Sequence, residues 1–497
     1  MPTEHFDVLI VGAGLSGIGA AWRLQADSPK KTYAILEGRD TIGGTWDLFR
    51  YPGIRSDSDM YTLGYAFRPW KEAKAIADGP SILKYVRDTA HEAGIDRHIR
   101  FNHMVKHAAF SSEDARWTVT ADRGGQPVTL TCNFLLMCSG YYDYAGGHRP
   151  EWPGEAEFQG RIVHPQHWPD DLDYTGKKVV VIGSGATAVT LIPEMAKTAA
   201  HVTMLQRSPT YMASRPAIDA GADKLRKRLP AKLAYDIIRA RNVLFGMYFF
   251  RMARKKPEAV KQRLLSMVKA QLPADFDMAT HFTPKYNPWD QRLCLVPDND
   301  MFESIKAGKA SVATDQIERF TPTGMQLKSG KTLDADVVVT ATGLKLHLLG
   351  GMTVEVDGRP VDFGQTYNYK GMMFSDVPNF ASVFGYTNAS WTLKADLTSE
   401  YVCRMLNHMD RRGMQIATPR NEGEDLGAEP WLDFSSGYVQ RSVHLFPKQG
   451  NKKPWKLHQN YALDLMALRY GKLEDGVMSF TRRGAPAAAS ADQRLAA

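Results

Sequence analysis

Two glycine-rich turns, each between a predicted strand and a predicted helix, constrain the fold of this chain more than any other feature. The first follows the apolar run Phe6 to Val11 and reads Gly12-Ala-Gly14-Leu-Ser-Gly17. The second follows Val179 to Ile182 and reads Gly183-Ser-Gly185-Ala-Thr187-Ala188. In such turns one glycine makes the bend, one lets the backbone approach a pyrophosphate, and the last packs the helix on the strand, where alanine is tolerated. The chain therefore predicts two Rossmann-like dinucleotide-binding units.

The residues that follow the second predicted strand of each unit distinguish the two nucleotides. Strand Tyr33 to Leu36 ends in Glu37, whose carboxylate accepts hydrogen bonds from a ribose diol and repels a phosphate. Strand His201 to Leu205 leads instead into Gln206 and Arg207, and a guanidinium suits a 2′-phosphate. We therefore predict FAD in the first unit and NADPH in the second. The predicted contacts are Gly12, Gly14, Leu15, Gly17 and Glu37 for FAD, and Gly183, Ser184, Gly185, Ala186, Thr187, Arg207 and Ser208 for NADPH.

Length and composition favour a soluble multidomain protein. With 497 residues the chain is too long for one hydrophobic core and suits two or three domains. No stretch approaches the ~20 apolar residues that span a bilayer, and the N-terminus enters a strand without an export signal. The four cysteines, Cys132, Cys138, Cys294 and Cys403, lack metal-ligand spacing. We therefore expect no metal site and a reduced, cytoplasmic location.

Repeated sequence patterns predict the domain organisation. Each half has hairpin material followed by a β-rich run that ends in a small residue and glycine, Phe134 to Gly140 and Val337 to Gly343. We expect an α/β fold with two Rossmann-like domains in a glutathione-reductase-like architecture, with a helical insertion. The predicted boundaries are 1–145 and 341–483 for the FAD-binding domain, 146–211 and 286–340 for the NADPH-binding domain, 212–285 for the insertion, and 484–497 for a flexible tail.

Basic residues are concentrated in the predicted insertion. The chain has a formal net charge of +8, and much of its basic sequence lies between Lys224 and Arg263. Within that stretch Val243 to Phe250 is apolar but too short to span a membrane. The stretch fits a helix of an inserted subdomain with a solvated basic face, or else a helix in peripheral contact with a membrane. No nucleic-acid-binding motif is present, so we expect no nucleic-acid partner.

Two longer motifs are specific enough to indicate a family. Phe158-Gln-Gly160-Arg-Ile-Val-His164-Pro-Gln-His-Trp168-Pro169 joins the two units, and a second motif runs from Gly43-Gly44-Thr-Trp46 to Asp57. On these motifs the chain resembles the flavin-dependent (type I) Baeyer–Villiger monooxygenases, near the subgroup of bacterial enzymes that activate thioamide prodrugs. Related N- and S-oxygenating enzymes usually carry Tyr or Phe at the position of Trp168. Stretches from Tyr286 to Pro297 and from Gly385 to Leu397 also match, so the likeness covers most of the chain.

The resemblance implies a reaction in which NADPH reduces FAD and O2 then forms a C4a-peroxyflavin. This species inserts one oxygen next to a ketone carbonyl, giving an ester or lactone, and oxidises sulfides to sulfoxides. The family's catalytic cation corresponds to Arg292. A fixed positive charge at this place favours the peroxide anion and its adduct with the substrate. Asp57 holds and tunes Arg292 through paired hydrogen bonds. The implied partners are a small-molecule ketone or sulfide and O2.

Further site residues are implied by the same resemblance. They are Gly44, Thr45 and Trp46 beside the flavin; Val105, whose backbone contacts adenine; Ile54, Arg55 and Ser56 facing the nicotinamide, with Asp57 also counted among the cofactor-binding residues; and Trp391, which lines the active site or belongs to the core. His164 and Trp168 correspond to a hinge that couples the domains and transfers no proton. Relatives commonly carry Lys directly before the active Arg, where it assists at the 2′-phosphate, whereas this chain has Gln291. The strength of a preference for NADPH over NADH therefore stays open.

Three other functions share parts of this pattern. A disulfide reductase has the same architecture but needs two cysteines early in the first domain, where this chain has Gly43-Gly44-Thr-Trp46. A dedicated N- or S-oxygenating flavin monooxygenase acts through the electrophilic hydroperoxyflavin; Trp168 and Arg292 argue against that dedication but leave sulfoxidation open. A flavin-binding sensor has no need of a second, phosphate-selective nucleotide site.

Overall fold

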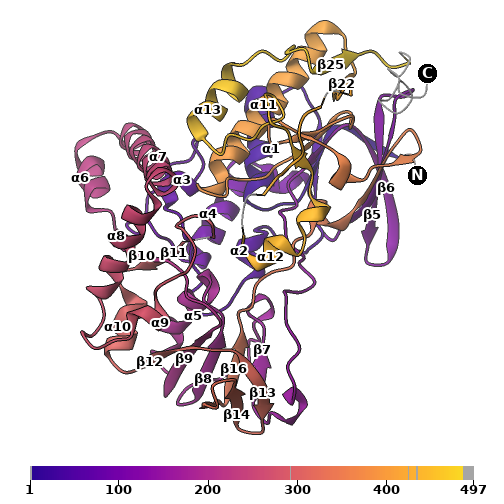
Figure 1. Ribbon diagram of the computed structural model, residues 1–497. Helices are drawn as coiled ribbons and strands as arrows, with labels where there is room; N and C mark the ends of the chain where they lie inside the picture. Colours follow the sequence, from indigo (N-terminus) through magenta and orange to yellow (C-terminus); the bar gives the residue numbers. More distant parts are fainter. Residues whose placement is uncertain (1–2, 292, 424, 433–434, 485–497) are drawn as a thin grey trace.

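Two parallel sheets, one for each glycine-rich turn, organise the protein. The computed structural model describes residues 3–291, 293–423, 425–432 and 435–484. The first sheet has the strand order β3-β2-β1-β6-β21, and the second has the order β12-β9-β8-β16-β7, at the bottom of Figure 1. In both sheets these five strands pair in parallel, which requires crossover connections and coverage on both faces. The predicted α/β fold with Rossmann-like units is confirmed.

The elements of the first unit are as follows. The parallel strands are β1 (Glu4–Val11), β2 (Tyr33–Leu36), β3 (Ile99–Arg100), β6 (Gln126–Met137) and β21 (Phe380–Ser382). An antiparallel layer extends from the first half of β6 and comprises β5 (Arg116–Arg123), β4 (Met104–Ser111), β17 (Thr353–Val356), which is parallel to β4, and β18 (Arg359–Pro360). The helices are α1 (Leu15–Asp27), α2 (Thr45–Leu48), α3 (Met60–Leu63), α4 (Gly79–Glu92) and α11 (Trp391–Arg412).

The second unit repeats this plan. Its parallel strands are β7 (Arg161–Val163), β8 (Lys178–Ile182), β9 (His201–Gln206), β12 (Ala310–Thr314) and β16 (Val337–Thr340). Strands β13 (Ile317–Thr321), β14 (Gly324–Leu327) and β15 (Thr332–Asp334) form an antiparallel layer, and the helices are α5 (Ala186–Met195) and α10 (Asp300–Lys306). The hairpins predicted before each β-rich run are therefore present in both halves.

Side-chain alternation along β1 explains why its sequence is apolar throughout. Val8 and Ile10 point into the core that contains α1, α4 and α11, whereas Leu9 and Val11 point into the core beneath the antiparallel layer. Because both faces of this strand are covered, neither set of side chains meets water. The glycine turn is consequently held rigidly at the carboxyl end of β1.

The insertion begins with a short strand and continues as helices. Strand β10 (Met212–Arg215) pairs with β11 (Cys294–Pro297), and helices α6 (Ala220–Arg228), α7 (Ala231–Lys255), α8 (Pro257–Lys269) and α9 (Met278–His281) lie between them. Helix α7 is anchored over α3, because the Tyr235 hydroxyl donates to the Tyr65 carbonyl and Arg239 donates to the carbonyls of Tyr61 and Gly64. None of the described helices is both long and apolar enough to span a bilayer.

The C-terminal segment packs beside the first unit. It contains β22 (Ile416–Pro419) paired with β25 (Met478–Thr481), β23 (Glu429–Pro430) paired with β24 (Lys448–Gln449), and the short helices α12 (Gly437–Gln440) and α13 (Tyr461–Leu465). In Figure 1 this segment lies at the top and front of the first unit. The predicted tail beyond residue 484 lies outside the described residues, and the predicted domain boundaries stay predictions.

Candidate functional site

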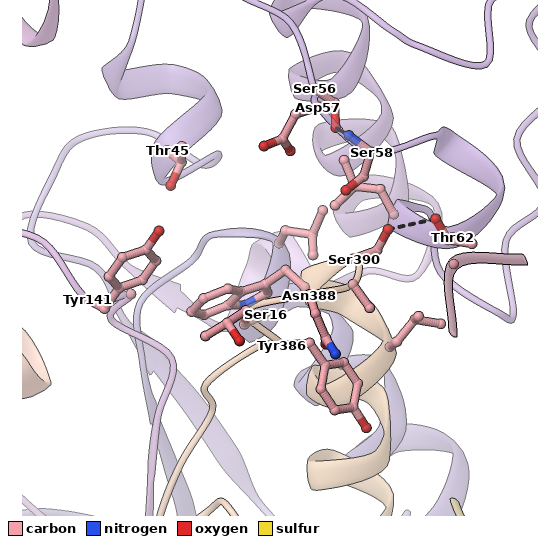
Figure 2. A pocket seen from close by; sticks show the side chains of 18 of the residues that line it. Ser16, Thr45, Ser56, Asp57, Ser58, Thr62, Tyr141, Tyr386, Asn388 and Ser390 are labelled. Atoms are coloured by element: carbon pink, nitrogen blue, oxygen red, sulfur yellow. Dashed lines mark hydrogen bonds between the residues drawn. The ribbon is translucent and has the colours of Figure 1, made fainter. Parts of the chain in front are cut away.

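A cavity of about 2030 Å³ connects the first glycine turn with the helices of the insertion. One end is lined by Gly12, Gly14, Leu15 and Glu37, and the opposite wall by α7 and α8. Figure 2 shows Thr45 and Asp57 pointing into the same space, which Tyr141 and Asn388 border from other elements. Predicted site residues from distant parts of the sequence therefore meet in one cavity.

The first glycine turn presents an uncapped helix terminus to this cavity. Gly12 adopts φ +105°, and a Cβ on Gly17 would lie 1.9 Å from the Gly12 carbonyl oxygen, so helix α1 packs directly on the turn. The N-cap residue Gly14 has no side chain to bond the first N–H groups of α1, and the first turn carries no acidic residue. Free N–H groups and the helix dipole together favour an anion at this point.

Glu37 is fixed by the backbone of two segments. Its carboxylate accepts hydrogen bonds from the N–H of Ala13 at 2.7 Å and of Arg39 at 3.0 Å. Burial raises the pKa of Glu37, and the two backbone N–H groups oppose that shift. Each oxygen accepts one of these bonds and keeps a further lone pair, so the predicted contact with a ribose diol is compatible with the geometry.

Asp47 is a buried carboxylate that sequence reasoning did not single out. Arg39 contacts it at 2.5 Å, Arg87 at 2.9 Å and Arg50 at 3.6 Å. Its side chain is 3% exposed, so the charge is removed from water and depends on these guanidinium groups. Asp47, which directly follows the Gly43-Gly44-Thr-Trp motif, thus connects this motif to Arg39, two residues after Glu37.

Replacing Asp47 by Ala is expected to lower the free energy of unfolding by about 3 kcal/mol, because it leaves several cations packed together without their shared anion. Urea unfolding of the holoprotein measures this loss. Asp88→Ala is the matched control, since its contact with Lys84 lies at the surface of α4 and should be worth about 0.5 kcal/mol or less. Equal losses in the two variants would contradict the role assigned to Asp47.

The Gly44-Thr-Trp segment forms a side of the cavity close to the glycine turn. The Thr45 hydroxyl lies 2.5 Å from the Tyr142 hydroxyl, and Trp46 is half-buried between the cores of both units. Burial raises the pKa of Tyr144 to about 12, so its hydroxyl stays protonated and can donate. Val105 and Glu37 both line the cavity, and the predicted contact of Val105 with adenine stays a prediction.

The cofactor-binding residues predicted between Ile54 and Asp57 divide into two groups. Ser56 and Asp57 line the cavity, and the Ser56 hydroxyl accepts a hydrogen bond from the Ser58 N–H at 3.0 Å. Ile54 instead packs in the core of the second unit, and Arg55 forms an ion pair with Asp300, so neither lines the cavity. The sequence did not separate the two groups.

Arg292, the predicted catalytic cation, lies outside the described residues. Its neighbours Trp289 and Leu293 line the cavity. Trp289 has φ +72°, a conformation that a tryptophan rarely adopts. The predicted contact between Asp57 and Arg292 stays a prediction.

Trp391 lines the cavity at the start of α11. Its indole N–H donates to the Ser16 hydroxyl at 2.8 Å, and Tyr141 stacks on its ring with centroids 5.2 Å apart. The preceding residue, Ser390, shares a hydrogen bond of 2.6 Å with Thr62 of α3, drawn as a dashed line in Figure 2. Ser16, Tyr141 and Ser390 are cavity residues that sequence reasoning did not single out, because no local pattern relates α1, the segment after β6 and the start of α11.

The second glycine turn lies away from this cavity and faces open space. A Cβ on Gly185 would meet no atom within 4 Å, and the following helix α5 has no side-chain cap and no acidic residue in its first turn. Arg207 and Ser208 are exposed, and the Ser184 hydroxyl donates to the Ser208 carbonyl at 3.1 Å. Ala186 begins α5, and Gly183 bends the chain with φ +136°.

Two contacts around this turn were not predicted. The Tyr51 hydroxyl bonds Thr187 and so connects the first unit to the second turn, and burial raises the pKa of Tyr51 to about 12. Burial lowers the pKa of Arg441, and the nearby charge of Arg207 lowers it further. Two guanidinium groups that repel each other favour a bound anion between or beside them.

The linker motif is explained by close packing. A Cβ on Gly147 would lie 2.0 Å from the His164 ring, so the chain crosses directly over the imidazole. His164 Nδ1 accepts a hydrogen bond from the Gln166 N–H at 3.2 Å, and burial lowers the pKa of His164. Trp168 packs edge-on against Tyr174 in the second unit. These contacts fit a connecting element, while the predicted hinge role stays a prediction.

The cysteines do not form the redox pair of a disulfide reductase. Cys132, Cys138, Cys294 and Cys403, all within the described residues, are buried and form no disulfide with one another. Burial raises the pKa of Cys132, Cys138 and Cys403, which opposes the thiolate that redox catalysis needs. In this chain the Gly43-Gly44-Thr-Trp segment, beside the first glycine turn, stands where a disulfide reductase needs its two cysteines.

Sequence comparisons relate the chain to oxygen-using flavoproteins. The pattern of the flavin-binding monooxygenase-like family matches residues 75–349, and that of the NAD(P)-binding Rossmann-like domain matches residues 10–77. The FAD-containing monooxygenase EthA of Mycobacterium tuberculosis H37Rv is 55% identical, over 97% of this chain and 99% of that protein. The probable FAD-binding monooxygenase AlmA of Acinetobacter baylyi is 49% identical, over 97% of each chain.

Solved structures share the fold at low sequence identity. A steroid monooxygenase bound to NADP superposes with a TM-score of 0.76 at 23% identity, covering 96% of this chain and 100% of that chain. A polycyclic ketone monooxygenase from Thermothelomyces thermophila superposes with a TM-score of 0.75 at 16% identity, covering 97% and 90%. At these identities the likeness shows the fold alone.

Proposed function

We propose, since this chain belongs to the flavin-binding monooxygenase-like family, that it uses NADPH, O2 and bound FAD to oxidise ketones and sulfides. The ketone products are esters or lactones, formed by inserting one oxygen next to the carbonyl, and the sulfide products are sulfoxides. One observation carries the proposal: the glycine turn that suits FAD and apolar side chains on the helices of the insertion line the same cavity. A flavin and an apolar substrate can therefore meet there.

The residues at the first turn fit FAD. The open N-terminus of α1 suits the pyrophosphate, and Glu37 at the end of β2 suits the ribose diol. Gly44 packs against Gly14 with no side chain between them, leaving room for a flat ring system along Thr45 and Trp46. When bound, FAD accepts hydride from NADPH and makes O2 reactive toward the substrate.

Around the reacting atoms the chain supplies charge and excludes water. Arg292, by family resemblance, supplies a fixed cation beside the oxygen that becomes negatively charged, and Asp57 positions it. Aromatic side chains of Trp46, Tyr141 and Trp391 form part of the wall and limit access of water. A carbonyl carbon held next to the flavin would thus meet a nucleophilic oxygen in a largely apolar site.

The second turn fits NADPH. The space above Gly185 and the uncapped start of α5 suit a pyrophosphate, and Arg207 with Ser208 suits the 2′-phosphate. Arg441 adds a second guanidinium near Arg207. This neighbour offers a physical substitute for the lysine that relatives commonly carry where this chain has Gln291.

Arg207→Ala is expected to raise KM for NADPH by about 10-fold or more, because a charge-assisted phosphate contact is lost, and to leave KM for NADH nearly unchanged. Steady-state kinetics with both coenzymes measure the ratio. Arg161→Ala is the matched control, since Arg161 is an exposed arginine of the second unit paired with Asp171. An equal rise in KM for both coenzymes would refute the phosphate contact.

Product analysis of a substrate panel tests the proposal. Linear ketones, cyclic ketones and aryl sulfides are incubated with the purified holoprotein, NADPH and O2, and the products are identified by mass spectrometry. Esters or lactones together with sulfoxides support it. Sulfoxides without any ester or lactone would identify a dedicated S-oxygenating enzyme instead. NADPH oxidation that yields only hydrogen peroxide across the panel would contradict oxygenation of these substrates.

A further inference from the structure

Helix α7 exposes large apolar side chains to solvent in its second half. Leu244, Phe245 and Tyr248 are 63%, 65% and 63% exposed. Leu233 and Ile237, earlier on the same helix, are also exposed. Single exposed apolar side chains are common, but several of them in one contiguous patch mark an interaction surface.

These side chains form one stripe. Residues 233, 237, 244 and 248 are separated by four, seven and four positions, so they fall on one side of the helix. The other side of α7 is fixed by the buried Tyr235 and Arg239, which bond the backbone of α3 and its surroundings. The stripe cannot rotate inwards without breaking these bonds. We call this stripe, with Phe245 and the exposed cations Arg251 and Lys255 of α7 and Arg263 of α8 beside it, the α7 face.

The segment that contains the α7 face is strongly cationic. Residues 220–270 contain 14 Lys and Arg against three Asp and Glu. The formal net charge of this segment is therefore larger than the +8 of the whole chain. Arg251, Lys255 and Arg263 are exposed, and none of them forms an ion pair with another described residue. Apolar side chains are thus bordered by three positive charges that pair with no acidic side chain in the described part of the chain.

The α7 face also borders the mouth of the cavity. Leu244, Phe245 and Tyr248 line the cavity and are largely exposed at the same time. Arg251, Lys255 and Arg263 line it as well. Figure 1 shows α7 and α8 on the left side of the molecule, outside both sheets. Whatever binds the α7 face therefore lies across this opening.

We propose that the α7 face docks on the surface of an anionic lipid bilayer. Its apolar side chains enter the boundary between headgroups and acyl chains, and its cations pair with phosphate and carboxylate headgroups. A nucleic acid would use the cations but leave Leu244 and Phe245 in water. A second copy of the chain would bring two like-charged faces together, which is unfavourable. A bilayer satisfies both the apolar and the cationic side chains.

Docking in this way gives the cavity direct access to lipid. This consequence rests on the proposed oxygenation of ketones and sulfides. A long-chain ketone or sulfide dissolved in the bilayer would enter between α7 and α8 without passing through water. The α7 face thereby favours substrates that partition into lipid.

Vesicle flotation of the full-length holoprotein tests the proposal. Vesicles of phosphatidylcholine alone are compared with vesicles that also contain phosphatidylserine, at low and high salt. The protein should float with the anionic vesicles and be released by salt. The triple variant R251E/K255E/R263E should bind them about 100-fold more weakly, since each reversed cation near the surface loses its attraction to the headgroups. F245S/Y248S should lower binding about 10-fold or more.

The matched control reverses three exposed lysines elsewhere, K309E/K328E/K331E, with the same change in net charge. It should float like the unchanged protein, and circular dichroism with flavin absorbance checks the fold of every variant. Absence of flotation with anionic vesicles, or an equal loss in the control, would overturn the proposal. So would a dimer that F245S/Y248S dissociates, because a second copy would then cover the face. Flotation needs neither NADPH nor substrate, so its outcome is independent of the oxygenation assay.

Discussion

Arg292→Ala is expected to lower the rate of ester or lactone formation by about 10³-fold or more while leaving flavin reduction by NADPH nearly unchanged. The reason is that hydride transfer needs the two cofactors aligned, whereas oxygenation of a ketone develops negative charge on oxygen. Without a fixed cation that charge is stabilised poorly in an apolar cavity. Sulfide oxidation should suffer less, since a sulfide attacks an electrophilic oxygen.

Two measurements separate these steps. Anaerobic mixing with NADPH follows flavin bleaching, and product analysis under O2 follows oxygenation. Arg292→Lys keeps a cation but not the planar guanidinium, so it should recover part of the ketone activity. Loss of flavin from purified Arg292→Ala would mean that the residue holds the cofactor. Unchanged ester formation would remove Arg292 from the reaction.

Gly17→Ala is expected to yield protein that carries little or no FAD and unfolds with about 3 kcal/mol less free energy. In an isolated helix the same change would stabilise, because alanine is the better helix former. Here the new methyl group would lie 1.9 Å from the Gly12 carbonyl oxygen, which is backbone and cannot rotate away. Helix α1 must then move off the turn, and its N-terminus no longer meets the pyrophosphate.

Flavin content and urea unfolding measure the two effects of Gly17→Ala. Gly146→Ala is the matched control, because a Cβ there meets nothing within 4 Å and its φ is not positive. The second unit supplies an internal comparison, since Ala188 already stands at the position equivalent to Gly17. Full flavin occupancy and unchanged stability in Gly17→Ala would show that the turn tolerates the displacement.

Much of the fold could be predicted because its signals are local. A strand, a glycine turn and a helix occupy consecutive residues, so the β1-α1 and β8-α5 units could be predicted in full from the sequence. The family could be predicted for the same reason, since its motifs are continuous stretches of sequence around Gly44 and Trp168. The relatives and the matched family confirm it.

Part of the candidate site could not be predicted from the sequence. Ser56 and Asp57 line the cavity while their neighbours Ile54 and Arg55 do not, although one motif contains all four. Asp47 gave no signal of its own, because its ligands Arg39 and Arg87 come from different elements. Trp391 was ambiguous between core and site until its contacts with Ser16 and Tyr141 were known.

The sequence by itself determined which backbone turns can receive a dinucleotide, because the size of glycine and the charge of Glu37 or Arg207 act through residues close in the chain. Only the tertiary structure decided that the first turn, Trp391 and the α7 face share one cavity, and that the apolar stripe of α7 faces outwards. Helical spacing defines a stripe but not its direction. The direction follows from the bonds of Tyr235 and Arg239 to α3 and its surroundings, which join residues about 170 positions apart.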